Sequence, residues 1–425
     1  MVETKENMAD VANLEKIFTD LSKSNRYFRY YLENCVRCGA CIEACHFYQG
    51  DKDNALNAPV FKNEQVRRLV KQKSLLGRLG FFGRPKENYT EDLTYAVFES
   101  CTNCRRCVMF CPFSIDISLI NTAARSALIK IDKAPEMLLM IADMQIQRRE
   151  SPEDYIDDFK DQIRDHEEAI REEIGDPSFR IPVAEKGADI LYIPLSGAHT
   201  ILPAAKIFHA AGENWTLSIF DSPNYGFLAG DVERAKKITK ALLDEAKELG
   251  VKKLVISECG HGFRIMKQFV KLWFDDFSYE VELIAETVAN YIREDKIHLD
   301  KSKNADLYTH HDPCQHARNA GVFEESRYVL QHAVSEFVEM TPNRTKNWCC
   351  GGGGGVLGDP EFEETRLKGG KMKAEQIKAT GAKAVSTTCD NCLLQIRELN
   401  DHYKLDVQID NLTTIVSRAL VYQKS

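Results

Sequence analysis

The 425-residue sequence lacks several signals that would place it in a common protein class. It has no run of 18 apolar residues, so we expect no membrane-spanning helix. Its first 20 residues are polar and charged, which predicts no signal peptide. A formal charge of −8 argues against nucleic acid as a partner. No GxGxxG motif follows a strand and no P-loop is present, so we expect any flavin or nicotinamide to sit on another chain.

Cysteine is the residue that stands out. The chain has 14 cysteines, and all but Cys259 fall into three tight groups. Disulfide-dense chains are small and secreted, and they do not place cysteines in closely spaced series. With 44% hydrophobic and 28% charged residues, the chain has the composition of a globular protein of two to four domains. We therefore interpret the cysteines as metal ligands in a reducing compartment.

The first two groups share the spacing C-x2-C-x2-C-x3-C, beginning at Cys35 and at Cys101. Pro112 follows the second group, whereas His46 stands at the matching position of the first. This spacing holds [4Fe-4S] cubanes in two-cluster ferredoxins, because three thiolates wrap one cube and the fourth reaches the other. Zinc would need its ligands in two pairs, which fits badly. We predict one cubane on Cys35, Cys38, Cys41 and Cys111, and a second on Cys101, Cys104, Cys107 and Cys45.

The two motifs are far apart in the sequence. The 55 residues between Cys45 and Cys101 exceed the spacer of a small β-rich ferredoxin, and residues 62–79 have the pattern of a helix. This arrangement resembles the helical ferredoxin module of succinate dehydrogenase iron–sulfur subunits and of heterodisulfide reductase subunits.

The third group contains an adjacent pair of cysteines followed by five glycines, Gly351 to Gly355. Glycine permits close backbone approach, and five thiolates exceed the four corners of a cubane. The pattern resembles the CCG domain of the heterodisulfide reductase family, in which five cysteines hold a noncubane [4Fe-4S] cluster. The alternative is a pair of buried or regulatory thiols with a flexible linker. The resemblance implies that the ligands and catalytic residues are Cys314, Cys349, Cys350, Cys389 and Cys392, with Gly351, Gly352 and Gly353 against the cluster.

An internal repeat with a period of about 120–130 residues explains the middle of the chain. Strands are expected at 190–193 and 307–310, and long helices at 232–249 and 362–379. A short strand then runs into a cysteine turn, at Cys259 in the first copy and at Cys389 in the second. This alternation predicts a duplicated α/β domain.

The first copy has lost the ligand pattern. Ser196 or Gly197 stands where the second copy has Cys314, Asn224 and Tyr225 lie near the position of the adjacent pair, and Gly262 replaces the last cysteine. We interpret this copy as free of cofactor. A pocket for a substrate or partner, or a different metal, is the alternative. Those alternatives would involve His199, Cys259 and His261.

The predicted fold class is α+β and multidomain. We expect a helical two-cluster ferredoxin-like domain over residues 1–130 and an acidic linker with helices over 131–185. A degenerate CCG-like α/β domain follows over 186–300, and a CCG domain with its noncubane cluster over 301–425.

One segment has an unusual charge. Residues 62–86 carry eight Lys or Arg and one Glu, together with several large apolar side chains. Such a segment can dock on a membrane surface or on a membrane subunit. The alternative is a solvated helix face whose apolar residues lie in the core. The apolar residues in question are Leu75, Leu76, Leu79, Phe81 and Phe82.

The order of the modules resembles the D-type subunit of heterodisulfide reductase. The WCCGGGGGV sequence (348–356) is most similar to the cytoplasmic subunits of the Dsr (K subunit), Hmc and Tmc membrane redox complexes of sulfate reducers. This resemblance implies an oxidoreductase subunit that lies in the cytoplasm, peripheral on the inner face of the cell membrane. Its partners would be an integral membrane haem b or quinone subunit and a multihaem cytochrome c.

The implied acceptor is a cytoplasmic disulfide-like substrate, such as a heterodisulfide or a persulfide or trisulfide on a sulfur-carrier protein. Because this chain can build one noncubane site and the methanogen enzyme has two, other functions stay open. One is a pure electron relay without S–S chemistry. Another is the iron–sulfur subunit of a flavin dehydrogenase for glycolate or glycerol 3-phosphate.

Overall fold

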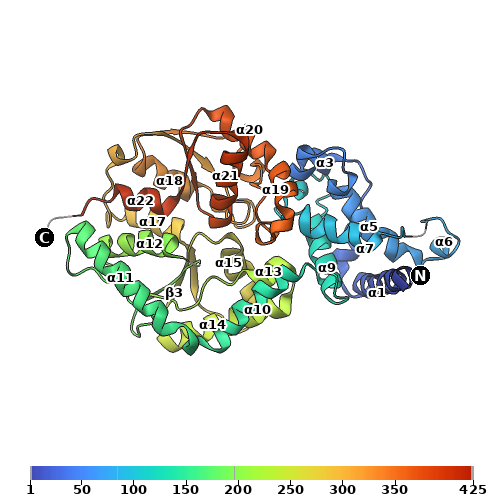
Figure 1. The fold of residues 1–425 in the computed structure, drawn as a ribbon, viewed down its shortest axis with the longest axis horizontal. Helices are drawn as coiled ribbons and strands as arrows, with labels where there is room; N and C mark the ends of the chain where they lie inside the picture. Colours follow the sequence, from blue (N-terminus) through green and yellow to red (C-terminus); the bar gives the residue numbers. More distant parts are fainter. Residues whose placement is uncertain (1, 84, 196, 423–425) are drawn as a thin grey trace. The chain divides into compact units, whose positions relative to one another are not determined.

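The computed structural model describes residues 2–83, 85–195 and 197–422. They form two compact units (Figure 1). Unit 1 comprises Met1–Met140, Leu228–Asp231 and Trp348–Glu375, and unit 2 comprises Ile141–Phe227, Val232–Asn347 and Gln376–Ser425. Ser196, which the repeat matches to Cys314, lies outside the described residues.

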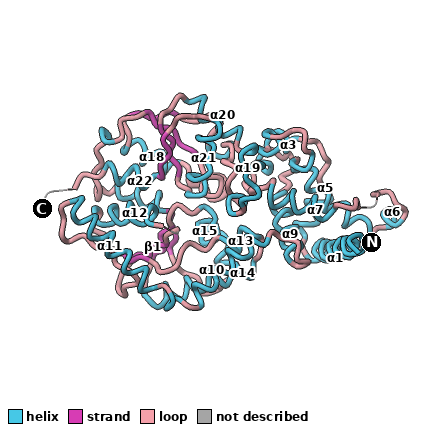
Figure 2. The backbone as a smooth tube through the Cα atoms, viewed as in Figure 1, coloured by secondary structure: helices cyan, strands magenta, loops and turns pink. Residues whose placement is uncertain are grey.

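Unit 1 is helical, and among its described residues there is no β-strand (Figure 2). A turn of π-helix, Tyr95–Glu99, immediately precedes the second cubane motif. The helices are α1 (Val2–Ser24), α2 (Arg26–Glu33), α3 (Ala40–Ala44), α4 (His46–Gly50), α5 (Pro59–Gln72), α6 (Leu75–Arg78), α7 (Tyr89–Thr94), α8 (Arg106–Met109), α9 (Ile117–Ile129), the start of α10 (Glu136–Glu150), α19 (Glu363–Gly369) and the start of α20 (Lys371–Thr380).

The core of unit 1 forms where α1, α5 and α9 pack together. Helix α9 begins at the cap Asp116, whose carboxylate accepts from Leu119 N–H at 3.2 Å. Its next turns bury Ile120, Ala124 and Leu128 against the other helices. The predicted two-motif ferredoxin module is thus a helical domain, as expected.

The expected helix over 62–79 divides in two. Helix α5 ends at Gln72, and α6 restarts after Ser74, whose hydroxyl accepts from Gly77 N–H at 3.2 Å. A Cβ on Gly77 would lie 2.3 Å from the carbonyl oxygens of Lys71 and Gln72, so only glycine fits this turn.

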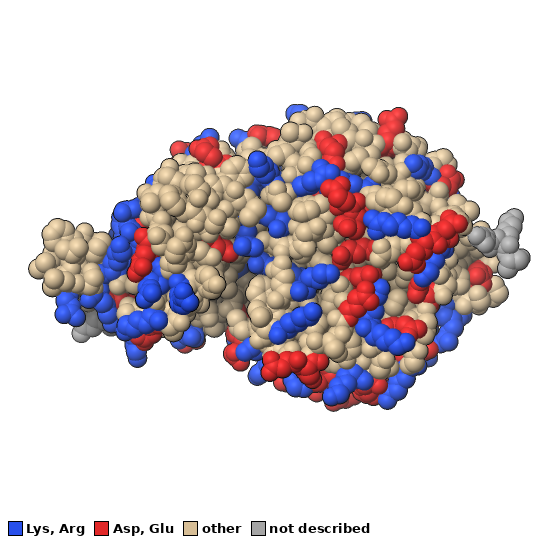
Figure 3. All heavy atoms as spheres, turned by 180° about the vertical axis from the view of Figure 1, so that it is seen from behind, with Lys and Arg blue, Asp and Glu red and all other residues tan. Residues whose placement is uncertain are grey.

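Beyond the break, the apolar side chains of this segment do not enter the core. Leu75, Leu76, Leu79 and Phe81 are exposed, whereas Val66 and Leu69 of α5 are fully buried. The tip near α6 is the tan projection at the left edge of Figure 3. The core alternative is therefore wrong for Leu75, Leu76, Leu79 and Phe81, whereas Phe82 is half-buried.

Unit 2 contains two four-stranded sheets with the same strand order. The first has the order β2-β1-β3-β4 and the second β6-β5-β7-β8, and all neighbouring strands are parallel. The identical topology confirms the predicted duplication of an α/β domain. The strands are β1 (Ile190–Ile193), β2 (Trp215–Leu217), β3 (Lys253–Ile256), β4 (Glu280–Leu283), β5 (Leu307–His311), β6 (Glu336–Val338), β7 (Ala384–Thr387) and β8 (Gln408–Asn411).

Helices connect these strands in both repeats. In the first repeat α14 (Val232–Leu249) agrees with prediction, but the helix expected over 362–379 is interrupted between α19 and α20. Gly369 ends α19 against the Phe47 ring, where a Cβ would lie 2.6 Å from a ring carbon. The other helices are α11 (Ile156–Ile174), α12 (Ala198–Ala210), α13 (Tyr225–Ala229, which ends in unit 1), α15 (Gly260–Arg264), α16 (Val270–Trp273), α17 (Ile284–Arg293), α18 (Glu324–Ala333), α21 (Asp390–Tyr403) and α22 (Leu412–Ala419).

The two repeats share one core. Helix α12 of the first packs on α22 of the second, and α17 of the first packs on α18 of the second. These pairs are equivalent by the repeat, so the repeats are related by an approximate twofold arrangement. The expected acidic linker is helical here, and α11 buries Ile163 and Ile170 in this same core.

Burial of Glu245 in unit 2 generates a prediction about pH. Burial raises its pKa to about 7, although the Ser218 hydroxyl and Ile219 N–H (2.9 Å) donate to the carboxylate. Because the folded protein holds this proton more tightly than the unfolded chain does, ionisation of the carboxyl disfavours the folded state. The free energy of unfolding therefore falls as pH rises from about 4.5 to 7. We expect Glu245→Gln to remove up to about 3 kcal/mol of this decline.

The measurement is the unfolding midpoint of the anaerobically purified protein between pH 5 and pH 8. Glu233→Gln is the control, because Glu233 lies on the same helix and its side chain is exposed. An unchanged pH profile for Glu245→Gln would show that another group causes the decline.

Candidate metal centre

The two cubane motifs have the same backbone conformation. Arg37 and Gly39 of the first have φ values of 58° and 82°, and Asn103 and Arg105 at the matching positions have 51° and 62°. Left-handed residues that alternate in this way turn successive N–H groups toward one side, which makes a concavity for an anionic group. Three of these four residues have a side chain that disfavours this conformation. The shared geometry therefore indicates a shared task, which is to wrap a thiolate-bound cluster.

Several thiols of the two predicted sets lie near one another in unit 1, whereas Cys38 is exposed. Burial, with a further contribution from neighbouring Cys35, Cys45 and Cys111, raises the pKa of Cys41 to about 12. Burial also raises the pKa of Cys107 well above its usual value, with Cys45 among the thiols that add to the effect. Buried thiols that oppose each other's ionisation need a cation before they become thiolates.

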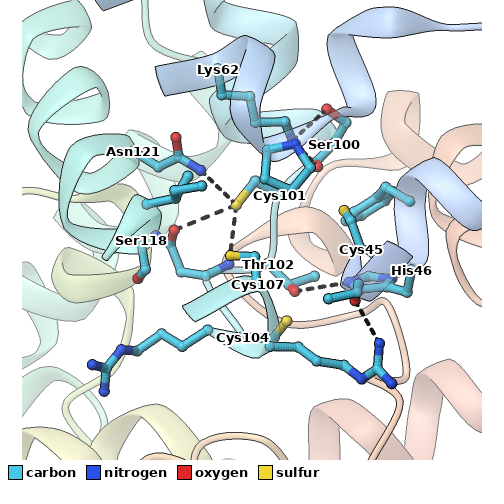
Figure 4. Close-up of a pocket in the computed structure, with 17 residues that line it drawn as sticks. Cys45, His46, Lys62, Ser100, Cys101, Thr102, Cys104, Cys107, Ser118 and Asn121 are labelled. Atoms are coloured by element: carbon cyan, nitrogen blue, oxygen red, sulfur yellow. Dashed lines mark hydrogen bonds between the residues drawn. The ribbon is translucent and has the colours of Figure 1, made fainter. Parts of the chain in front are cut away.

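Cys45, Cys101, Cys104 and Cys107 line one cavity of unit 1 (Figure 4). Asn121 Nδ2 donates to Cys101 Sγ at 2.9 Å. Because the cysteine from the first motif joins the three from the second, the arrangement agrees with the predicted exchange of the fourth cysteine. Their role as ligands stays a prediction.

A buried lysine stands beside this cavity. The Lys62 ammonium donates to the backbone oxygen of Ser100 and to its hydroxyl at 3.0 Å (Figure 4). Its positive charge opposes the rise in the pKa of Cys45 that burial causes. Sequence reasoning placed Lys62 in a basic surface segment and missed this role; its side chain is 2% exposed.

The CCG pair also lies in unit 1, and one of its thiols meets the second cubane motif. Cys349 Sγ is 3.4 Å from Thr102 Oγ1, and Thr102 directly follows the predicted ligand Cys101. Thr102 Oγ1 is in turn 3.3 Å from His46 Nε2. Cys104, Cys349 and His46 bring their ligand atoms within 4.8 Å of one another.

His46 explains the departure from proline noticed in the sequence. Its Nδ1 lies 2.9 Å from the carbonyl oxygen of Gly369, which can only accept, so Nδ1 carries a proton. In the neutral ring, Nε2 is then an acceptor, and the Thr102 hydroxyl can donate either to it or to Cys349 Sγ. A proline could make neither contact. The sequence showed that this position differs, but it could not show that Thr102 and Gly369 would meet it.

The glycine run approaches the cubane motif closely. Gly354 has φ +67°, and a Cβ there would lie 2.8 Å from the backbone of Thr102. Arg125 fixes the same place, because its guanidinium donates to the carbonyl oxygens of Gly354 at 2.6 Å and Cys101 at 2.7 Å. Gly352 N–H lies 3.5 Å from Cys350 Sγ. The predicted contact of Gly351, Gly352 and Gly353 with a cluster stays a prediction.

The other three cysteines of the predicted noncubane set lie in unit 2, at the carboxyl ends of adjacent strands. Cys314 follows β5, and Cys389 follows β7 at the start of α21, with Cys392 in its first turn. All three are buried. The Cys392 thiol, with the N–H groups of Cys392 and Gly260, donates to Cys389 and lowers its pKa. Gly260 belongs to the first repeat, which thus contributes to the thiol environment of the second.

The first repeat does not copy this arrangement. A Cβ on Gly262 would lie 1.8 Å from the Ser222 hydroxyl oxygen, so a cysteine there would require the Ser222 side chain to move. His199 is engaged by Asp390 at 2.7 Å. Among the described residues, His199, Cys259 and His261 form no group with ligand atoms within 4.8 Å. His199 and Gly260 of the first repeat thus contact Asp390 and Cys389 of the second.

The donor set fits iron–sulfur clusters. Buried thiols, N–H groups aimed at sulfur, and left-handed turns around each motif are the features with which proteins hold such clusters.

In the described part of the chain, no helix combines the length and the apolar character needed to cross a bilayer.

Known proteins share both cysteine regions. A model of the 4Fe-4S dicluster domain matches residues 31–115, and one of the cysteine-rich CCG domain matches residues 308–397. The iron–sulfur subunit of an Hdr-like menaquinol oxidoreductase from Archaeoglobus profundus is 28% identical, over 95% of this chain and 82% of that protein.

Two further relatives carry different names. The D-type subunit of the dihydromethanophenazine:CoB–CoM heterodisulfide reductase from Methanosarcina mazei is 27% identical, over 92% of this chain and 94% of that protein. An EtfAB:quinone oxidoreductase from Syntrophomonas wolfei is 24% identical, over 86% of this chain and 55% of that protein. The similarity runs through both cysteine regions and the repeat between them. The chain therefore resembles heterodisulfide reductase D subunits and Hdr-like iron–sulfur subunits over most of its length, and it contains a 4Fe-4S dicluster domain and a cysteine-rich CCG domain.

Proposed function

We propose that this chain passes electrons between two cubane clusters and a noncubane cluster on its CCG domain, where they reduce a disulfide-like acceptor. The observation that carries the proposal is the contact of Cys349 with Thr102. A cysteine of the CCG pair touches a residue directly beside a predicted cubane ligand. A path of bonded and hydrogen-bonded atoms thus joins the two kinds of site within unit 1.

The proposed cofactors are two cubane [4Fe-4S] clusters and one noncubane [4Fe-4S] cluster. The matched CCG model includes all five cysteines of the third group, which supports their assignment as noncubane ligands. When bound, the clusters supply one-electron transfer at potentials that the surrounding residues tune.

We likewise propose four functional domains, with boundaries after residues 130, 185 and 300.

The chain's own residues would set the electron path. Asn121 donates to the Cys101 sulfur, and hydrogen bonds to sulfur stabilise the more negative, reduced state of a cluster. Lys62 adds a buried positive charge near Cys45. Thr102 carries one proton, which it gives either to the Cys349 sulfur or to His46.

The proposed reaction balances with two electrons. Cleavage of one S–S bond to two thiols takes up two electrons and two protons, and the electrons arrive singly from a reduced quinol or haem by way of the cubanes. Similarity to an Hdr-like menaquinol oxidoreductase subunit and to a heterodisulfide reductase subunit supports this proposal. We propose that this chain works with an integral membrane haem b or quinone subunit and a multihaem cytochrome, peripheral on the cytoplasmic face.

A second candidate is a pure electron relay without S–S chemistry. The lost ligand pattern of the first repeat favours it, because Gly262 stands where the second repeat has Cys392 and the first repeat therefore lacks the cysteines of a second noncubane site. The similarity to a quinone oxidoreductase with a longer chain is compatible with the same function.

The first prediction concerns the cofactor count. Three [4Fe-4S] clusters require about 12 Fe per chain, and Cys350→Ala is expected to leave about 8 Fe with the cubane spectra intact. Iron analysis and EPR of anaerobically purified protein measure both. Cys259→Ala is the matched control, because Cys259 is equally buried and is no predicted ligand. Full iron content in Cys350→Ala would remove the CCG pair from the ligand set.

The second prediction separates the two candidate functions. With a reduced viologen as donor, the purified protein is expected to cleave a low-molecular-weight disulfide, and Cys350→Ala is expected to lose at least 100-fold in rate. Thiol release against viologen oxidation should give two thiols for two electrons. The contrary outcome is that wild-type protein with its full iron content transfers electrons from reduced viologen to a haem or quinone partner but releases no thiols. In that case the relay function replaces the proposed one.

The third prediction addresses the electron path. Thr102→Val keeps the side-chain shape but removes the hydroxyl that contacts Cys349 and His46. Loss of about 1 kcal/mol of hydrogen bonding to a reduced cluster lowers a one-electron potential by about 40 mV. We expect a shift of this size, measured by EPR-monitored redox titration, at unchanged iron content. The control Thr239→Val removes a buried hydroxyl that bonds only within α14; an equal effect there would contradict the account.

A further inference from the structure

The segment after α5 presents a compact apolar tip to solvent. The tip comprises residues 74–83, and its large side chains are Leu75 (76% exposed), Leu76 (52%), Leu79 (67%) and Phe81 (72%). Four such residues within seven positions form a continuous apolar cluster, whereas single exposed apolar residues are common on any protein. In Figure 3 the end of this segment projects from the surrounding surface.

Local contacts hold the tip without using these side chains. Ser74 caps α6 through Gly77 N–H, and Gln72 Nε2 donates to the Gly83 carbonyl oxygen at 3.0 Å. The Lys71 ammonium lies 5.8 Å from the centre of the Phe82 ring. The backbone of the tip is thus closed at its base, and the exposed leucines and Phe81 contribute little to the fold.

The tip segment itself carries charges of one sign. From Gln65 to Lys86 the sequence contains no acidic residue. Lys73 and Arg78 are exposed cations of this stretch, whereas Arg68 pairs with Glu64 at 3.2 Å and Lys86 lies near Asp92. An apolar tip with cations around it matches an anionic bilayer, in which acyl chains lie beneath phosphate groups.

We propose that the tip at residues 74–83 inserts its leucines and Phe81 into the headgroup region of an anionic lipid bilayer, with Lys73 and Arg78 at the lipid phosphates. A ten-residue tip is too small for a standard protein interface, which needs about 800 Å² from each partner. Direct contact with lipid goes beyond the proposed attachment through partner subunits. It does not depend on the identity of the electron acceptor.

The test is co-sedimentation of the full-length, cluster-loaded protein with vesicles of phosphatidylcholine and phosphatidylglycerol (about 7:3) and of phosphatidylcholine alone. We expect binding to the anionic vesicles, at least tenfold weaker binding to neutral ones, and loss of binding in about 0.5 M NaCl. Leu79→Asp with Phe81→Asp should weaken binding at least tenfold, and Lys73→Glu with Arg78→Glu should do the same.

Leu272→Asp is the matched control, because Leu272 is 76% exposed on α16 and should bind like wild type. Failure of wild type to bind anionic vesicles, or equal binding by the tip variants, would overturn the proposal. Binding only to vesicles that carry a purified membrane subunit would also overturn it, in favour of a protein contact. Iron content and disulfide cleavage are measured on the same samples and are expected to stay normal in the tip variants. Failure of the lipid-binding proposal is therefore distinct from failure of the proposed function.

Discussion

Buried sulfur is the constraint on which the arrangement of this chain depends. Thiols placed close together away from water resist ionisation, as the raised pKa values of Cys41 and Cys107 show. A metal cluster removes that cost, because it supplies positive charge to several thiolates at once. The left-handed turns around both cubane motifs, the N–H and amide donors aimed at sulfur, and the buried Lys62 all serve the same end.

The same constraint bears on the position of the CCG segment, which is the cysteine pair Cys349–Cys350 and the glycine run that follows it. Its glycines, Arg125 and His46 hold it against the second cubane motif, and each contact uses backbone carbonyl groups that only this packing brings together. Gly354 is needed because Thr102 leaves no room for a Cβ. The glycine run thus has a steric reason within unit 1, in addition to any contact with a cluster.

The sequence predicted the helical module, the duplicated α/β domain and the loss of ligands in the first copy, because each has a local signature of spacing or periodicity. It did not predict the break between α5 and α6, which depends on the close approach of Gly77 to the preceding carbonyl groups. It placed Lys62 on a surface although the side chain is buried at Ser100. His46 was visible as a departure, but its partners are 56 and 323 residues away, and no local pattern encodes such contacts.

The central claim is that the CCG cluster and the second cubane are electronically connected through the contact of Cys349 with Thr102. Pulsed EPR of partly reduced, cluster-loaded protein tests it most directly. If the claim holds, the spin of the second cubane relaxes faster whenever the CCG cluster is paramagnetic than when it is diamagnetic. Relaxation of the cubane that is independent of the CCG cluster's state would contradict the account.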